Sequence, residues 1–130
     1  MANQQFDERS IVASYNAFTS TYTPGTVTTV TTNTLRDLRI DALLVENTDT
    51  ADATMTLYMS IGGTPTEIAQ VTIPAGSGTA ATPLKDVLAA LFPTGYQQLL
   101  LPANQLLAVS FAAAPAAGRR YTVLVLGGTL

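Results

Sequence analysis

The sequence predicts an all-β protein, an antiparallel β-sandwich of jelly-roll-like arrangement with one short helix and an extended N-terminal arm. Three observations favour this class. Apolar and polar residues alternate with a period of two, about seven or eight such stretches recur at intervals of roughly 8–12 residues, and Gly, Pro and Asn separate them. Short antiparallel strands with this punctuation are typical of sandwiches and barrels.

We expect two parts, an N-terminal arm over residues 1–25 and a β-sandwich domain over residues 26–130. The first part ends at Pro24 and Gly25, a turn signal. No internal repeat or second domain is visible, and 130 residues suit one core.

Within the arm, four residues recur at helical spacing: Ile11, Tyr15, Phe18 and Tyr22. The Ser, Thr and Tyr residues around them favour extended structure instead, so the pattern alone leaves helix and strand open. We interpret the arm as largely extended.

The composition argues against several kinds of function. Charged residues make up 12% of the chain, about half of the usual roughly 25%, so Thr, Ser, Gln and Asn cover much of the surface. Such a surface suits contact with other subunits. The net charge is −3, and the single lysine, Lys85, and the scattered arginines form no basic stripe that would neutralise phosphates. We therefore expect no direct binding of nucleic acid.

The chain contains no cysteine, histidine or tryptophan. This excludes disulfides, thiolate metal sites and thiol nucleophiles. The polar start of the sequence lacks the basic and apolar regions of a secretory signal, so we expect synthesis in the cytoplasm. No apolar run reaches the roughly 18–20 residues of a membrane helix, so we expect a soluble chain without membrane contact.

Residues 26–35 are dominated by Thr and Val, whose β-branched side chains favour a strand. The next strand is predicted within LRDLRIDALLVENT, residues 35–48, with Arg39 and Asp41 facing outward. We expect four of its residues to face inward: Leu38, Ile40, Ala42 and Leu44. Leu43 and Val45 make the outward face apolar again, which predicts that the second half of this strand is covered on both sides.

Residues 43–63 predict a β-hairpin. A polar loop, NTDTAD, separates the preceding strand from ATMTLYMSI, which alternates cleanly. The residues expected inward are Met55, Leu57, Met59 and Ile61. Gly62 and Gly63 then supply a turn before a further strand that contains Ile68 and ends at Pro74.

Residues 82–92 form the one convincing helix. Thr82 is placed to cap the free backbone N–H groups, Pro83 suits the first helical position and Asp86 lies near the positive end of the dipole. Four residues form an apolar stripe at helical spacing: Leu84, Val87, Leu88 and Leu91. The sequence PTG at 93–95 ends the helix.

Residues 96–114 predict two short strands joined at 102–104, and a closing strand follows Gly118. In the closing strand, three residues face one way: Tyr121, Val123 and Val125. Leu124 and Leu126 face the other way, so we expect both of its faces to be buried.

No group of residues predicts catalysis. Without histidine or cysteine, common acyl-transfer sites and metal sites lose their usual members. Asp37, Asp41 and Glu46 share a strand, but nothing places two of them across a bond at the roughly 5–10 Å that a glycosidase needs. We therefore interpret them as solvated positions, and we predict that the chain is not an enzyme and uses no cofactor.

Asp49 and Asp52, with Asn47 nearby, offer oxygens to a calcium ion in the loop. The spacing lacks the EF-hand pattern, and stabilisation of the turn by these side chains is the preferred interpretation, so we predict no metal site while the ion stays an alternative. The sequence GSG at 76–78 has no following Gly-Lys-Ser/Thr and is interpreted as a flexible loop rather than a phosphate cradle.

Surface contacts remain open at two places. The aromatic side chains of Tyr15, Phe18 and Tyr22 stack on sugars or on a partner, or they fasten the arm to its own domain. Arg119 and Arg120 begin the closing strand and pair with a neighbour's carboxylates or simply remain solvated.

From residue 43 to the C-terminus, the order of parts resembles small β-sandwich virion proteins of tailed bacteriophages, of the capsid-decoration or cement type. The resemblance lies in VENTDTADATMTLYMSIGG, a strand that ends in VTIPAG, the helix PLKDVLAALF, the stretch LLLPANQLLAVSFAAAPAAG and the closing YTVLVLGG. It covers roughly two-thirds of the chain.

The resemblance implies a homo-oligomer, often a trimer, that sits on the outer capsid surface of the virion and bridges neighbouring major capsid proteins. The arm would then lie across a neighbouring subunit and become ordered on contact. The residues that we predict to make capsid or oligomer contacts are Phe6, Ile11, Tyr15, Phe18, Tyr22, Tyr121, Leu124 and Leu126.

An alternative is a phage tail or fibre-tip subunit that binds host carbohydrate. That function would use outward aromatic side chains such as Tyr58 and Tyr96 beside Asn or Asp. A third hypothesis, a carbohydrate enzyme that works through Asp37 and Asp41, is disfavoured by their spacing.

Overall fold

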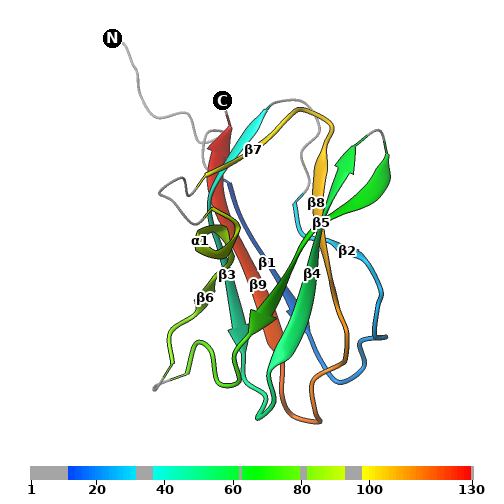
Figure 1. Cartoon of the computed structure of the whole chain (residues 1–130), viewed down its shortest axis with the longest axis vertical. Helices are drawn as coiled ribbons and strands as arrows, with labels where there is room; N and C mark the ends of the chain where they lie inside the picture. Colours follow the sequence, from blue (N-terminus) through cyan, green and yellow to red (C-terminus); the bar gives the residue numbers. More distant parts are fainter. Residues whose placement is uncertain (1–11, 32–36, 62, 80–81, 93–97, 130) are drawn as a thin grey trace.

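Two antiparallel β-sheets pack face to face (Figure 1). The computed structural model describes residues 12–31, 37–61, 63–79, 82–92 and 98–129. One sheet has the strand order β1-β9-β3-β6, with β7 also paired to β3, and the other has the order β2-β8-β4-β5. The predicted all-β sandwich is confirmed.

The elements follow one another along the chain as β1 (Val12–Phe18), β2 (Thr28–Thr29), β3 (Leu38–Asn47), β4 (Ala53–Ile61), β5 (Thr64–Ile73), β6 (Lys85–Asp86), α1 (Val87–Leu91), β7 (Leu99–Leu101), β8 (Leu106–Phe111) and β9 (Tyr121–Thr129). Sequential strands often lie in different sheets, so the chain repeatedly crosses from one layer to the other. This order is compatible with the predicted jelly-roll-like arrangement.

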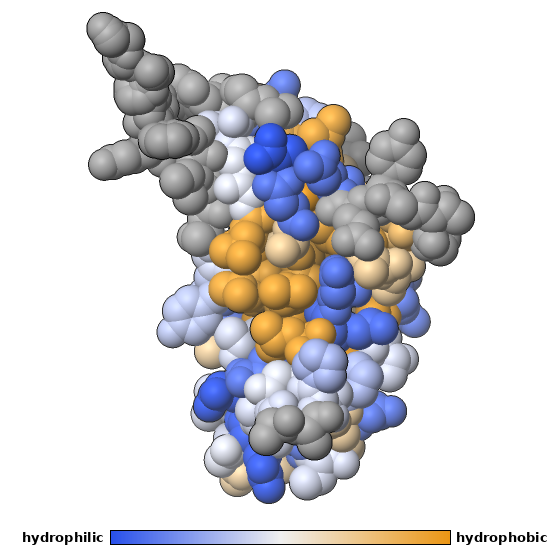
Figure 2. All heavy atoms as spheres, turned by 90° about the vertical axis from the view of Figure 1, so that its left-hand side faces the viewer, coloured by the Kyte–Doolittle hydropathy of each residue, from blue (hydrophilic) through white to orange (hydrophobic). Residues whose placement is uncertain are grey.

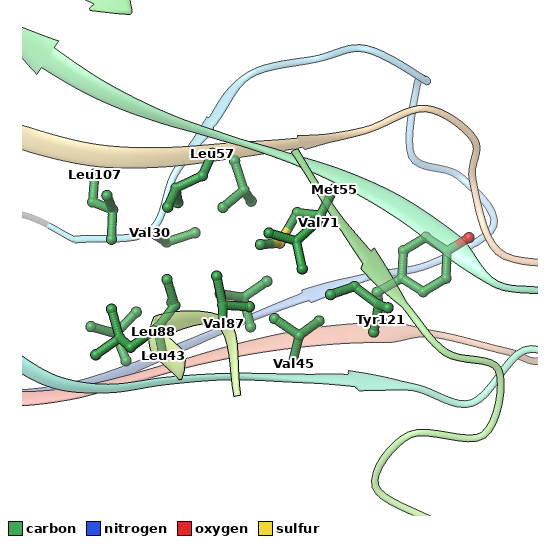
Figure 3. Close-up of a cluster of buried hydrophobic side chains, with 14 of the residues drawn as sticks. Val30, Leu43, Val45, Met55, Leu57, Val71, Val87, Leu88, Leu107 and Tyr121 are labelled. Atoms are coloured by element: carbon green, nitrogen blue, oxygen red, sulfur yellow. The ribbon is translucent and has the colours of Figure 1, made fainter. Parts of the chain in front are cut away.

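The core lies between the two sheets and is almost entirely apolar (Figure 3). Met55 and Leu57 of β4 and Leu107 of β8 meet Leu43 and Val45 of β3 across it, and all five side chains are fully buried. Full burial of such a side chain stabilises the fold by roughly 1.5–3 kcal/mol. The predicted inward positions of β4 are confirmed for Met55 and Leu57.

Four aromatic rings close one end of this core: Phe18, Tyr22, Phe111 and Tyr121. Phe18 and Phe111 meet edge to face with their centroids 5.0 Å apart, and Phe111 and Tyr121 lie 4.5 Å apart. The Tyr22 hydroxyl donates to the Thr26 carbonyl at 2.6 Å and accepts the Phe111 N–H at 3.0 Å. The cluster therefore ties β1, the loop after it, β8 and β9 together.

A β-bulge in β3 reverses part of the predicted inward face. The register on β9 shifts between Ile40, which lies opposite Gly127, and Ala42, which lies opposite Leu126. Beyond this point Leu43 and Val45 are fully buried. The prediction that Ala42 and Leu44 face inward was wrong, because the extra residue moves every later side chain of β3 to the opposite face.

Gly127 permits the close approach of β9 to this bulge. A Cβ atom built at this position would lie 1.9 Å from the carbonyl oxygen of Arg39 and 3.0 Å from the Cα of Ile40. Both are backbone atoms, so no side-chain rotation relieves the overlap. The glycine in the strand is therefore required by the approach of β3.

The predicted hairpin over residues 43–63 was wrong. β3 and β4 lie in different sheets, so the loop between them crosses the sandwich rather than joining paired strands. Asn47 holds this crossing, because its side-chain amide donates to the carbonyls of Ala51 at 3.0 Å and Ile73 at 3.2 Å. The hairpin forms between the next two strands: Ile61 pairs with Thr64, and β5 returns antiparallel along β4.

The helix is shorter than predicted. α1 covers Val87–Leu91, whereas the pattern predicted 82–92. Asp86 is its N-cap, and the carboxylate accepts the Ala89 N–H at 3.2 Å. Thr82 does not cap the helix, because it forms β-bridges with the loop before it and the two residues ahead of α1 pair with β3 as β6. The buried side chains Val87 and Leu88 cover the core between β3 and β5, as the stripe predicted.

Part of the predicted arm is a strand of the chain's own sheet. β1 pairs with β9 over its full length, from Val12 opposite Gly127 to Phe18 opposite Tyr121. The extended conformation predicted here is confirmed for these residues, and their partner within the chain is β9; a contact of this segment with a neighbouring subunit stays a prediction. The boundary at residue 25 stays a prediction, and residues 1–11 lie outside the described residues.

Other predicted strands are confirmed with shifted ends. β7 and β8 are the two short strands expected within 96–114, and β9 is the closing strand. β5 ends at Ile73, directly before Pro74. Of the strand predicted over 26–35, β2 covers Thr28–Thr29, and residues 32–36 lie outside the described part.

Substitution of Gly127 tests the close approach at the bulge. Gly127→Ala should lower the free energy of unfolding by roughly 3 kcal/mol or more, because its Cβ overlaps backbone atoms. Gly118→Ala is the control, since Gly118 has φ +77° but open space where the new Cβ would lie, and it should cost only about 1–2 kcal/mol. Urea unfolding measures both, and equal losses would contradict the close approach.

Candidate interaction surface

The outer face of the five-stranded sheet carries a row of apolar side chains across three strands. Leu124 of β9 lies opposite Tyr15 of β1 on one side and opposite Leu44 of β3 on the other. Residues directly opposite one another in antiparallel strands project from the same face. Because Val123 and Val125 are fully buried inside the sandwich, the side chains of this row point outward. Tyr15 is 68% exposed.

A second row extends this surface. Leu126, 37% exposed, lies opposite Ala42 of β3. Leu84, also 37% exposed, reaches the same side, because its side chain and that of Glu46 both lie within 3.4 Å of a Cβ built at Gly78. We use the name outer apolar face for the set Tyr15, Ala42, Leu44, Leu84, Leu124 and Leu126.

Figure 2 looks onto the side of the molecule where β3, β6 and α1 lie. Apolar side chains gather across its middle, with hydrophilic side chains above and below them. An apolar centre inside a polar rim is the usual anatomy of a protein contact surface.

Paired charges lie beyond both ends of the two rows. At one end Arg39 Nε lies 2.8 Å from Asp41 Oδ1, and the Gln98 side chain donates to the same oxygen at 3.1 Å. At the other end Arg120 Nε lies 2.9 Å from Glu46 Oε1, which also accepts the Thr122 hydroxyl at 2.9 Å. Because these four charges are paired within the chain, a partner that covers this rim does not bury any of the four unpaired. Asp86 of β6, which lies opposite Leu44, accepts the Ala89 N–H instead.

The predicted contact residues divide into three groups. Tyr15, Leu124 and Leu126 belong to the outer apolar face. Phe18 and Tyr121 are 5% and 3% exposed and pack in the chain's own aromatic cluster, which Tyr22 joins. Phe6 and Ile11 lie outside the described residues. Whether any of the eight contacts a partner stays a prediction.

The expectation that both faces of β9 are buried was wrong within this chain. Tyr121, Val123 and Val125 are buried, whereas Leu124 is only half-buried and Leu126 is exposed. The sequence pattern also failed to reveal Ala42, Leu44 and Leu84 as surface residues. The signal for the first two was Gly127, since a glycine inside a strand often marks a bulge or a close backbone approach.

The carboxylates proposed for chemistry are engaged in local structure. Asp37 accepts the Ala103 N–H at 2.9 Å, and Asp41 and Glu46 are held by the arginine pairs of the rim. These hydrogen bonds and ion pairs, and not a separation suited to glycoside cleavage, account for the positions of the three carboxylates.

Asp49 and Asp52 stabilise loops. Asp49 accepts the N–H of Thr50 at 2.7 Å and that of Ala116 at 3.0 Å. Asp52 accepts the N–H of Ala75 at 2.9 Å. Within the described residues, no three or more His, Cys, Asp or Glu side chains group as metal ligands. These contacts favour the interpretation in which the aspartates hold the turn.

The loop at 76–78 is a structured turn rather than an open cradle. Gly76 and Gly78 have φ values of +75° and +86°, a conformation that favours glycine. The Ser77 hydroxyl donates to the Pro74 carbonyl at 2.6 Å, and the Gly78 N–H donates to the Thr82 carbonyl at 2.7 Å. These groups are therefore already bonded within the chain.

The aromatic residues suggested for carbohydrate binding are not assembled into a site. The Tyr58 hydroxyl lies 2.9 Å from the Ser110 hydroxyl, and Tyr58 is half-buried. Tyr96 lies outside the described residues. At the closing-strand end, Arg120 pairs with Glu46 of its own chain, and the Arg119 guanidinium donates to the Thr48 carbonyl at 3.2 Å.

Comparison with known proteins gives one structural likeness. No protein-family model matches the sequence, and no curated protein matches it. The structure is similar to a chain titled "Cyanophage Pam1 capsid asymmetric unit", with a TM-score of 0.47 and 17% identity over 100% of this chain and 92% of that chain. In the described part of the chain, no helix is long and apolar enough to cross a membrane.

Asp49 should make the free energy of unfolding depend on pH in the acidic range. The backbone N–H groups of Ala116 and Thr50 hold the pKa of its carboxyl below the ordinary value of 3.8. A carboxyl with a lowered folded-state pKa stabilises the fold above its unfolded pKa and loses this contribution as the pH falls through the folded pKa.

We therefore expect the free energy of unfolding of the native protein to exceed that of Asp49→Asn at about pH 5–7. This difference should shrink below about pH 3.8. Urea unfolding as a function of pH measures it. A difference that persists unchanged to about pH 2 would contradict the role of Asp49.

Proposed function

We propose that the chain is a structural virion protein of a tailed bacteriophage, a decoration or cement subunit on the capsid surface. It associates with itself and with the major capsid protein, and it bridges neighbouring capsid subunits to stabilise the head. The sequence resemblance from residue 43 onward motivates this function. The outer apolar face is the observation that carries it, because an apolar surface inside a polar rim is the usual anatomy of a protein contact.

The remaining features fit a contact function. The carboxylates Asp37, Asp41 and Glu46 bind loops and arginines of the chain itself. Only 12% of the residues are charged, so covering the surface with a partner desolvates few charges. A brace needs a rigid body with an apolar contact surface, and repeated attachment to a shell multiplies weak individual contacts. The resemblance implies three copies in the assembly, and this number stays a prediction.

The arm keeps a smaller role than the sequence predicted. Because β1 belongs to the chain's own sheet, the part of the predicted arm before it, with Phe6 and Ile11, is the part we propose to contact a neighbour. Such a contact would add apolar area to that of the outer apolar face.

A head-binding assay tests the function. Purified protein is mixed with undecorated heads assembled from the major capsid protein of the phage that carries this chain, and binding is measured by co-sedimentation. We expect native protein to bind and Leu126→Asp to bind at least ten times more weakly, because a carboxylate would be desolvated in the contact.

Ile68→Asp is the matched control, since Ile68 is 41% exposed on β5 of the other sheet. It should bind like the native protein, and the melting temperatures should show that both variants fold. Absence of binding by the native protein would overturn the proposed function. Equal binding by the two variants would remove the outer apolar face as the contact.

Removal of residues 1–11 tests the arm separately. The deletion leaves every described strand complete, so the thermal unfolding midpoint should change little. We expect weaker binding to heads in the same assay, because Phe6 and Ile11 would no longer contribute apolar area. Unchanged binding would show that the attachment does not use the arm.

A further inference from the structure

The sheet edges of the sandwich differ in how they are protected. An exposed edge strand presents free backbone N–H and C=O groups, and proteins blunt such edges with short strands, prolines, charges or bulges. Among the described residues, the five-stranded sheet ends at β1 on one side and at the short strands β6 and β7, which both pair with β3, on the other. The four-stranded sheet ends at the two-residue β2 and at β5.

β5 is long but protected. It contains Pro65, which lacks a backbone N–H, and the charged Glu67. Its register on β4 shifts at Ile68, since Leu57 lies opposite Ala69 and Tyr58 lies opposite Glu67. A proline, a charge and a bulge are the devices that prevent pairing with another chain.

β1 has none of these devices. Its seven residues, VASYNAF, include no proline and no charge. Its register on β9 runs from Val12 to Phe18 without a shift. The Ser14 hydroxyl donates to the Val30 carbonyl at 2.8 Å and fixes the strand against the opposite sheet. β1 is therefore a regular edge that is held in place before any partner binds.

The residues of β1 are also arranged symmetrically about Tyr15. If two copies of the strand run antiparallel with Tyr15 at the centre, each residue faces one of similar chemistry in the other copy. In this register Tyr15 lies opposite Tyr15 and Ser14 lies opposite Asn16, while positions 13 and 12 lie opposite Ala17 and Phe18 along the backbone. Cross-strand pairs of like character, aromatic pairs among them, stabilise sheets.

We propose that β1 pairs with β1 of a second copy of this chain, antiparallel and about a two-fold axis at Tyr15. The two five-stranded sheets then form one continuous sheet. The row Tyr15, Leu124 and Leu44 of one copy continues into the same row of the other, so the pair presents one extended apolar surface on one side. This explains why Tyr15 is 68% exposed in the single chain.

A two-fold contact is closed and uses the same patch on both copies. It gives an even number of subunits, so the inference replaces the three copies that the resemblance implies by two copies, or by six where another surface holds three. The inference deepens the self-association in the proposed function and rests on it. Its tests use the isolated protein, so a failure of strand pairing is distinguished from a failure to bind heads.

Cysteine cross-linking tests the register directly, because the native chain has no cysteine. Residues directly opposite in antiparallel strands have Cα atoms about 4.5–5.5 Å apart, within the range of a disulfide. Tyr15→Cys should therefore form a covalent dimer under mild oxidation. Ala17→Cys is the control on the same face of β1. Its two sulfurs would lie four residues out of register, roughly 14 Å apart, and should not cross-link.

A charge at the centre tests the affinity. Two lysines placed opposite each other repel, so Tyr15→Lys should weaken self-association at least fivefold in sedimentation equilibrium. Ile68→Lys, on the protected β5 edge, should leave it unchanged. The proposal is overturned if Tyr15→Cys does not cross-link or cross-links no faster than Ala17→Cys. It is also overturned if the two lysine variants associate equally, or if the native assembly contains an odd number of copies.

Discussion

A β-bulge in β3, opposite Gly127, decides which side chains of the five-stranded sheet face the core and which face outward. Ahead of the bulge Leu38 and Ile40 point inward, and beyond it Leu43 and Val45 do. The same shift turns Leu44 outward, where it meets Leu124 of β9 and extends the row to Tyr15. The buried core and the outer apolar face therefore depend on one irregularity and on the glycine that permits it.

Hydrogen bonds within the chain hold the loops of the sandwich, and these bonds do not involve residues of the outer apolar face. Asn47 holds the crossing from β3 to β4, and Asp49 holds the loop that precedes β9. The arginine pairs at both ends of the apolar rows satisfy the nearby carboxylates. The outer apolar face and the edge of β1 have no covering element among the described residues. Both features suit contact with protein, and neither requires a reacting group.

The alternation of apolar residues was enough to predict those strands that keep one period. β4 and β9 each follow the pattern without a change of inner face at the core residues, and Pro74 marks the end of β5. For β3 the predicted inner face was right only up to the bulge, because the one extra residue of a bulge does not change the composition of the strand. Partner strands were also out of reach: β3 and β4 are neighbours in sequence, but pairing is decided by the whole sandwich. The helix start was misplaced because the N-cap is Asp86 and not Thr82.

The candidate surface was predicted only in part, for the same reason. Leu124 and Leu126 were recognised from β9 alone, but their neighbours Leu44 and Ala42 required the register between strands. A reconstruction of the native virion by electron microscopy tests the central claim most directly. The outer apolar face should be covered there by protein density over Leu44, Leu124 and Leu126. A particle in which this face is turned to solvent, or a particle without the chain, would contradict the claim.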